Sequence, residues 1–241
     1  MEALDPEAGA ILLVDKPITW TSFNVVAKIR SALHKLCGHR VKVGHAGTLD
    51  PLATGLLIIG TGKMTKALPD LTGQDKAYTA TLRLGETTAS YDAETPVLET
   101  RSWEHVTESD IRNTLNSFLG EIQQRPPNFS AKRFEGERGY KLVRWGRPVE
   151  MLHVAVRIDR LELVEMNGPE VKLFVACSKG TYIRSLAHDI GQALGCGAHL
   201  SALRRTKSGE LDIANARTVD EWSAWLDQWA STRQRPEEQG T

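Results

Sequence analysis

The chain is organised around residues 44–60, which read GHAGTLDPLATGLLIIG. Glycines, a proline and a run of apolar residues surround one carboxylate, Asp50, so we expect a tight, fixed loop to present it. A carboxylate presented in this way suits a nucleophile. The same residues also have a purely structural interpretation. Asp followed by Pro is a common helix start, in which the Asp oxygen caps N–H groups, and residues 56–59 then form a buried strand.

Length and composition indicate one globular unit. A chain of 241 residues with 41% hydrophobic residues can bury one sizeable core. We expect one domain over residues 1–232 and a disordered tail over 233–241. No apolar run is long enough to cross a bilayer, and the first residues lack the basic start of a signal peptide. The three cysteines contain no Cys-x-x-Cys pair, so a soluble protein of the reducing cytoplasm is predicted.

Charge is distributed unevenly, although the formal net charge is zero. Residues 16–66 carry eight Lys or Arg residues against one acid, whereas residues 86–121 carry eight acids against two Arg. Further basic blocks occupy residues 125–147 and 172–207. If the basic blocks share a face, they can grip a phosphate backbone; the alternative is solvated charge scattered over the surface.

Two stretches resemble ligand-binding motifs only in part. Residues 60–65 read GTGKMT, but a phosphate-binding loop needs Gly where Leu57 stands and a hydroxyl where Met64 stands. Residues 34–39 hold two His and one Cys, with no second ligand pair at usable spacing. We therefore expect no nucleotide cofactor, no other cofactor and no metal.

Hydrophobic periodicity predicts the principal elements. Thr21 and Ser22 are placed to cap one predicted helix, and Thr107 with Asp110 to open another that Gly120 closes. A turn is expected at residues 167–169. The expected strands cover residues 10–14, 76–84, 154–164 and 171–178, and the expected helices cover residues 23–36, 106–119 and the stretch that starts near 180.

Three features of the sequence each allow two interpretations. Tyr78, near the start of a strand, can serve a ligand or simply pack at a sheet edge. Arg184, close to a strand-to-helix junction, can pair with a buried carboxylate or be a solvated helix arginine. The basic, proline-stiffened loop over residues 124–147 can clamp a large ligand or merely connect two elements.

Four segments, in this order along the chain, resemble the TruB family of pseudouridine synthases, which isomerise the T-loop uridine at tRNA position 55. The match runs from about residue 11 to about residue 211, and four segments in register make it specific. The segments are residues 15–17 with 21–22, residues 44–55, residues 126–136 and residues 177–186.

The resemblance implies a mixed α/β pseudouridine synthase fold: a long, mostly antiparallel sheet flanked by helices, with a central active-site cleft. It makes Asp50 the nucleophile, Tyr78 the residue that stacks on the base near its C5 proton, and Arg184 the partner of the aspartate. Loop 124–147 matches the thumb that closes over RNA. The substrate-binding residues that it implies are Lys16, His45, Gly47, Thr48, Lys132, Arg133, Arg144 and Tyr182.

We therefore predict a cofactor-free tRNA pseudouridine-55 synthase, an isomerase that flips its target base and binds the tRNA T-arm as a monomer. Two alternatives are a guide-RNA-dependent, dyskerin-like synthase and a tRNA-folding chaperone without chemistry. Phe129 stands where the family usually has Tyr, which removes a hydroxyl from the thumb. The chain also ends about thirty residues after Leu211, so we expect the form of the family without the small C-terminal RNA-binding (PUA) domain.

Overall fold

The computed structural model describes residues 4–127, 133–134, 137–138 and 152–233. The chain divides into two compact units: Met1–Gln74 with Arg204–Thr241, and Asp75–Leu203. Strand β12, Ala198–Ser208, contains the boundary and contributes residues to both units. The single domain over residues 1–232 stays a prediction, and the tail after residue 233 lies outside the described residues.

The strands form a mixed, mostly antiparallel sheet in the order β14-β1-β3-β12-β4-β11-β10-β7. β2, Val43–Ala46, pairs with β3, and β13, Leu211–Asp212, pairs with β12. The predicted fold class is confirmed in its α/β composition and its mostly antiparallel sheet; the central cleft stays a prediction. The remaining strands are β1 Ile11–Lys16, β3 Ala53–Thr61, β4 Lys76–Leu84, β7 Gly120–Gln124, β10 Val154–Asn167, β11 Glu170–Cys177 and β14 Arg217–Thr218.

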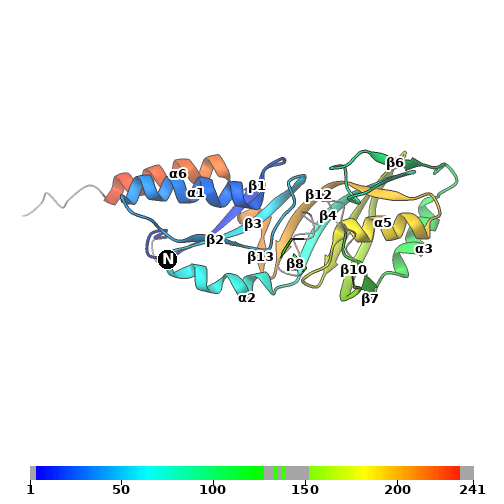
Figure 1. The fold of residues 1–241 in the computed structure, drawn as a ribbon, viewed down its shortest axis with the longest axis horizontal. Helices are drawn as coiled ribbons and strands as arrows, with labels where there is room; N and C mark the ends of the chain where they lie inside the picture. The colour runs from blue at the N-terminus through cyan, green and yellow to red at the C-terminus, as the bar shows by residue number, and fades with distance from the viewer. Residues whose placement is uncertain (1–3, 128–132, 135–136, 139–151, 234–241) are drawn as a thin grey trace, which may run out of the picture. The chain divides into compact units, whose positions relative to one another are not determined.

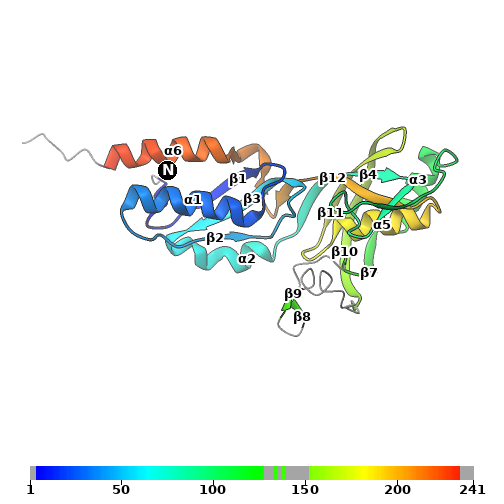
Figure 2. The same ribbon diagram turned by 45° about the horizontal axis from the view of Figure 1, so that its top comes forward.

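In the first unit, helices α1, Ser22–Cys37, and α6, Val219–Arg233, lie side by side (Figures 1 and 2). Thr21 caps α1 as predicted, in a reciprocal capping box with Asn24. The indole of Trp222 donates to the Leu13 carbonyl at 2.7 Å and so fastens α6 to β1. Shorter helical segments are η1 Gly62–Ala67, α2 Leu68–Thr72 and η2 Ile213–Asn215.

In the second unit, helix α5, Ile183–Ala193, packs against β4, and α3, Glu108–Asn116, packs against β10 (Figure 1). The predicted Thr107 cap is confirmed, but the helix predicted over residues 106–119 already ends at Asn116. Residues 117–119 turn instead into β7, which begins at Gly120 with φ 86°. Two short antiparallel pairs complete the unit: β5 Glu86–Thr88 with β6 Val97–Thr100, and β8 Arg133–Phe134 with β9 Glu137–Arg138.

The strand predicted over residues 76–84 is β4, and its neighbours are β12 and β11. Tyr78 therefore lies on an inner strand, and the sheet-edge interpretation of this residue is wrong. The turn predicted at residues 167–169 joins β10 to β11, with Gly168 at φ 55°. Burial alternates along β4 and β11, because only one face of each strand packs into the core. The threonines of β4 and the charged residues of both strands lie mostly at the less buried positions.

Candidate active site

The loop that carries Asp50 joins β2 to β3 within the first unit. After Asp50 the chain makes a turn at residues 51–52, and the Ala53 N–H donates to the Asp50 carbonyl at 3.1 Å. No helix follows, so the interpretation of Asp50 as a helix cap is wrong. The chain instead enters β3, where residues 56–59 form the buried strand that the sequence predicts.

Both sequence neighbours of Asp50 are held by hydrogen bonds to the start of α1 and to the segment before it. The Ser22 hydroxyl accepts from the Leu49 N–H at 2.9 Å and donates to the Leu49 carbonyl at 3.1 Å. The Thr19 N–H donates to the Pro51 carbonyl at 2.8 Å. Asp50, half-buried, is thus presented from a backbone that is fixed on either side of it, as a nucleophile requires.

Lys16, at the end of β1, is fully buried at 0% exposure. Its ammonium donates to the carbonyls of Pro17 at 2.9 Å, Pro51 at 3.3 Å and Trp20. Burial lowers the pKa of Lys16 to about 8, while the Asp50 carboxylate opposes the shift. The resemblance implies that Lys16 lines the substrate site; in the structure, its ammonium fastens the loop around Asp50 to the loop after β1.

Arg205 on β12 is the functional candidate that sequence reasoning missed. Only 2% exposed, it donates from Nε to the Leu56 carbonyl at 2.7 Å and from Nη2 to the Gly47 carbonyl at 2.9 Å. The sequence places it in a basic block that suggests a surface contact with RNA. No sequence signal distinguishes it, because its partners are backbone carbonyls.

Three other predicted residues lie on or beside the same loop. His45 on β2 has a buried Nδ1 atom with no hydrogen-bond partner among the described residues. Burial, and secondly the charge of Arg205, lower the pKa of His45, so its imidazole is neutral at pH 7. Gly47 adopts φ 70°, and Thr48 is exposed, so its hydroxyl is accessible to a ligand.

A pocket of about 500 Å³ opens in the first unit next to this loop. Its walls include the ion pair between Arg204 and Asp15, whose two N–O distances are 3.0 and 2.7 Å. Trp20 offers an apolar surface at the same place. The full lining is Asp15, Lys16, Pro17, Trp20, Thr54, Arg204, Thr218, Val219 and Asp220.

The second unit holds the other three central predictions. Tyr78 on β4, opposite Val175 of β11, is 8% exposed. Tyr182 precedes α5, and the side chain of the buried Gln124 both accepts from its N–H at 2.8 Å and donates to its carbonyl at 3.1 Å. Arg184 lies in the first turn of α5.

Arg184 is 5% exposed, so the interpretation as a solvated helix arginine is wrong. Its Nη1 lies 3.6 Å from Oδ2 of the buried Asp92 and donates to the Ser90 carbonyl at 3.3 Å. Asp92 is itself held through Oδ1, which accepts from the Ser90 hydroxyl at 2.6 Å and the Glu94 N–H at 2.9 Å. The sequence assigns Asp92 only to an acidic run, so its role beside Arg184 was missed. The pairing of Arg184 with Asp50 stays a prediction.

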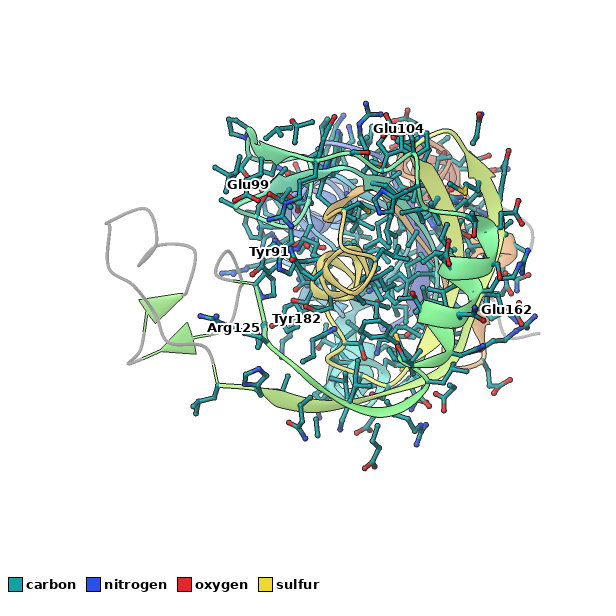
Figure 3. All side chains as sticks on the ribbon, turned by 90° about the vertical axis from the view of Figure 1, so that its right-hand side faces the viewer. Tyr91, Glu99, Glu104, Arg125, Glu162 and Tyr182 are labelled. Carbon is teal, nitrogen blue, oxygen red and sulfur yellow. The ribbon has the colours of Figure 1, made fainter. Side chains whose placement is uncertain are left out.

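The loop predicted to act as a thumb, residues 124–147, lies partly outside the described residues, as do Lys132 and Arg144. Arg133 begins β8. Where the loop leaves β7, the Ser185 hydroxyl of α5 donates to the Arg125 carbonyl at 2.7 Å. Arg125 and Tyr182 are both seen beside α5 in Figure 3. The start of the loop is therefore bonded to the helix that carries Arg184.

Within the described ranges, no group of three or more His, Cys, Asp or Glu side chains is arranged to hold a metal ion. The described helices also include none that is long and apolar enough to cross a membrane.

Comparisons with known proteins give the family. Residues 34–183 match the model of the TruB family pseudouridylate synthase N-terminal domain, and residues 184–237 match that of the tRNA pseudouridylate synthase B C-terminal domain. The chain is 49% identical over 221 residues to tRNA pseudouridine synthase B of Phocaeicola vulgatus, covering 91% of this chain and 94% of that protein. Its identity to the Flavobacterium johnsoniae protein of that name is also 49%, over 86% and 92% of the two chains.

A solved structure supports the same family. The crystal structure of a Cbf5–Nop10–Gar1 complex contains a chain that is 31% identical, with a TM-score of 0.72. The similarity covers 95% of this chain and 57% of that one. Two family models that together cover most of the sequence, and relatives matched over nearly their whole length, lead to one conclusion: this chain belongs to the TruB family of pseudouridylate synthases.

Proposed function

We propose that this protein is a tRNA pseudouridine synthase that isomerises uridine 55 in the T-loop, with Asp50 as its nucleophile. The observation that carries the proposal is the Asp50 loop, which is held on both sides in a member of the TruB family. The names of the curated relatives supply the substrate class.

The reaction needs no redox partner and no external energy. The N-glycosidic bond between N1 and C1′ breaks, the uracil turns, and a C5–C1′ bond forms; C5 then loses a proton and N1 gains one. The Asp50 carboxylate assists by adding either to C6 of the base or to C1′ of the sugar, and is released when the product forms. Either route needs an ionised carboxylate on a loop that does not move.

Tyr78 and Arg184 complete the proposed chemistry. Tyr78 offers a flat ring for stacking on the uracil and a phenol near the C5 proton that must leave. Arg184 would keep Asp50 ionised in a site that the bound base desolvates. The neutral His45 and the exposed Thr48 would contact the flipped nucleotide, because a base in a folded T-loop must leave its stack to be modified.

The partner is the T-arm of tRNA, bound by a monomer. Support comes from the basic residues before and after the Asp50 loop and from the basic thumb segment that leaves β7 beside α5. Within that segment we assign Lys132, Arg133 and Arg144 to the RNA backbone. Affinity should therefore fall steeply with salt, whereas kcat at saturating tRNA should change little.

The test is tritium release from tRNA transcripts labelled at C5 of uridine, with purified protein and no added guide RNA. We expect release from the intact transcript and none from a transcript in which uridine 55 is replaced by cytidine. Release from both transcripts would contradict the assignment of position 55. Absence of release from every transcript would contradict the proposed activity.

A guide-RNA-dependent synthase is the second candidate that the resemblance implies, and a chain of similar fold has been solved in a multi-protein assembly, the Cbf5–Nop10–Gar1 complex. Identity favours the first candidate: 49% to tRNA pseudouridine synthase B against 31% to that chain. The same transcripts separate the two. Modification of tRNA only after a guide RNA and partner proteins are added would favour the guide-dependent reaction.

A further inference from the structure

Arg205 is an unusual residue for the interior of a protein. A fully buried guanidinium normally faces a carboxylate, because an isolated buried charge is costly. Two of the donors of Arg205 instead bind backbone carbonyls, those of Gly47 and Leu56. These carbonyls precede and follow Asp50, by three and six residues respectively.

The surroundings of Arg205 are shaped to let it reach both carbonyls. At Gly47, whose φ is 70°, an added Cβ would lie 3.2 Å from Arg205 Nη1, so the guanidinium packs against a backbone that carries no side chain. At Gly55, whose φ is 98°, an added Cβ would lie 2.3 Å from the Arg205 carbonyl oxygen. The side chain of Arg205 thus lies against Gly47 in the loop, while its backbone lies against Gly55 in β3.

We propose that Arg205 is a positioning residue for the reaction of Asp50: its guanidinium bridges Gly47, at the start of the loop, and Leu56, in the strand that follows it, and so fixes where the carboxylate sits. The inference rests on the proposed function only for what Asp50 does. Arg suits this task because its planar, rigid fork offers donors at fixed directions, whereas a lysine ammonium is a point donor on a flexible stem.

Two contributions of Arg205 need to be separated: its geometry and its charge. The positive charge of Arg205 acts on nearby groups, since it is one cause of the lowered pKa values of Lys16 and His45. Arg205→Lys keeps the charge but loses the planar fork; Arg205→Gln loses the charge and keeps one donor group, its amide NH2. If Arg205 acts by fixing the position of Asp50, kcat falls in both variants.

The experiment measures kcat and KM of wild type, Arg205→Lys and Arg205→Gln by tritium release from tRNA. A displacement of about 1 Å in a reacting group lowers rates about 100-fold, so we expect kcat to fall about 100-fold in both variants, with KM within about threefold of wild type. Hydrogen exchange of the amides over residues 47–56 should accelerate about tenfold or more, and this readout needs no activity.

The control for general destabilisation is Leu226→Ala. Leu226 is fully buried on α6, a helix that packs against α1, β14 and β1. It should lose stability, yet keep kcat within about twofold of wild type and leave exchange over residues 47–56 unchanged. Gly47→Ala is the second variant if the Arg205 variants do not fold; its methyl group would lie 3.2 Å from Arg205 Nη1 on a backbone with φ 70°, so the guanidinium would have to shift, and kcat should fall in the same way.

Wild-type kcat in either Arg205 variant would overturn the proposal, and full rescue by Lys would assign the effect to charge. An equal loss of kcat in Leu226→Ala would also overturn it. If wild type itself modifies no tRNA, the proposed function fails, but accelerated exchange confined to residues 47–56 would still establish that Arg205 holds the loop.

Discussion

Asp92→Asn tests the buried network around Arg184. The substitution keeps the shape of the side chain and removes its charge. Two hydrogen bonds to Oδ1, from Ser90 and from the Glu94 N–H, lose their ionic character, and the contact with Arg184 at 3.6 Å loses its attraction.

The expected magnitude follows from this geometry. Two unit charges 3.6 Å apart attract by about 5 kcal/mol at an effective dielectric constant of about 20, and part of this attraction offsets the cost of burying both charges. Removing one member of a buried pair typically costs about 3–5 kcal/mol. Because Asn retains an acceptor oxygen, we expect the free energy of unfolding to fall by about 3 kcal/mol.

Urea denaturation at 25 °C and pH 7 measures the change. The matched control is Glu94→Gln, an exposed carboxylate two residues away, which should stay within about 0.5 kcal/mol of wild type. The kcat of Asp92→Asn should also fall, by about tenfold or more, because Arg184 loses a contact that orients it. Wild-type stability in Asp92→Asn would show that this pair contributes nothing to the fold, contrary to the expected loss.

Three further variants probe the Asp50 loop. Burial lowers the folded-state pKa of Lys16 to about 8, below its unfolded value, so the unfolded state binds more protons above pH 8. The stability of wild type relative to Lys16→Met, measured by urea titration at each pH, should therefore rise from pH 8 to about pH 10. A stability difference that does not change with pH would contradict the lowered pKa. Gly55→Ala should lower the urea midpoint by the equivalent of about 3 kcal/mol or more, because the added methyl group would clash with the Arg205 backbone. Gly38→Ala should cost only about 1 kcal/mol, because its φ is also positive but no atom lies within 4 Å of the added methyl group. Equal losses of stability in the two variants would contradict the clash at Gly55. Ser22→Ala should lower kcat about tenfold and leave KM unchanged, because Leu49 loses both of its hydrogen bonds to the Ser22 hydroxyl. Tritium release measures both constants. An unchanged kcat would mean that Asp50 is held without Ser22.

Local sequence signals predicted much of the fold. Alternation in a Thr-rich segment identified β4 with its bounds, and a Thr cap identified the start of α1. These signals are local because strand alternation and helix capping depend on residues close together in the chain. The Asp50-Pro51 pair is the counterexample: it has the form of a helix start, but the chain enters β3, because burial of an apolar strand outweighs a capping preference.

The residues that hold the site were harder to predict. Arg205 and Asp92 are charged, and charged residues are mostly exposed, so the sequence places both in surface runs of charge, although both are buried. Their roles depend on backbone carbonyls and on an arginine that lie far away in sequence. Such contacts exist only in the folded chain. Resemblance to a family implies Asp50, Tyr78 and Arg184, but it does not point to Arg205 or Asp92.

The activity proposed for this protein depends on Asp50 acting as the nucleophile on tRNA. The most direct measurement compares wild type with Asp50→Asn for tritium release from C5-labelled tRNA, with tRNA affinity measured in parallel. We expect wild type to release tritium, and Asp50→Asn to bind tRNA within about threefold of wild type and to release none detectable. Release at the wild-type rate by Asp50→Asn would contradict the role of Asp50. Tight binding without release by wild type would favour a tRNA-folding chaperone instead.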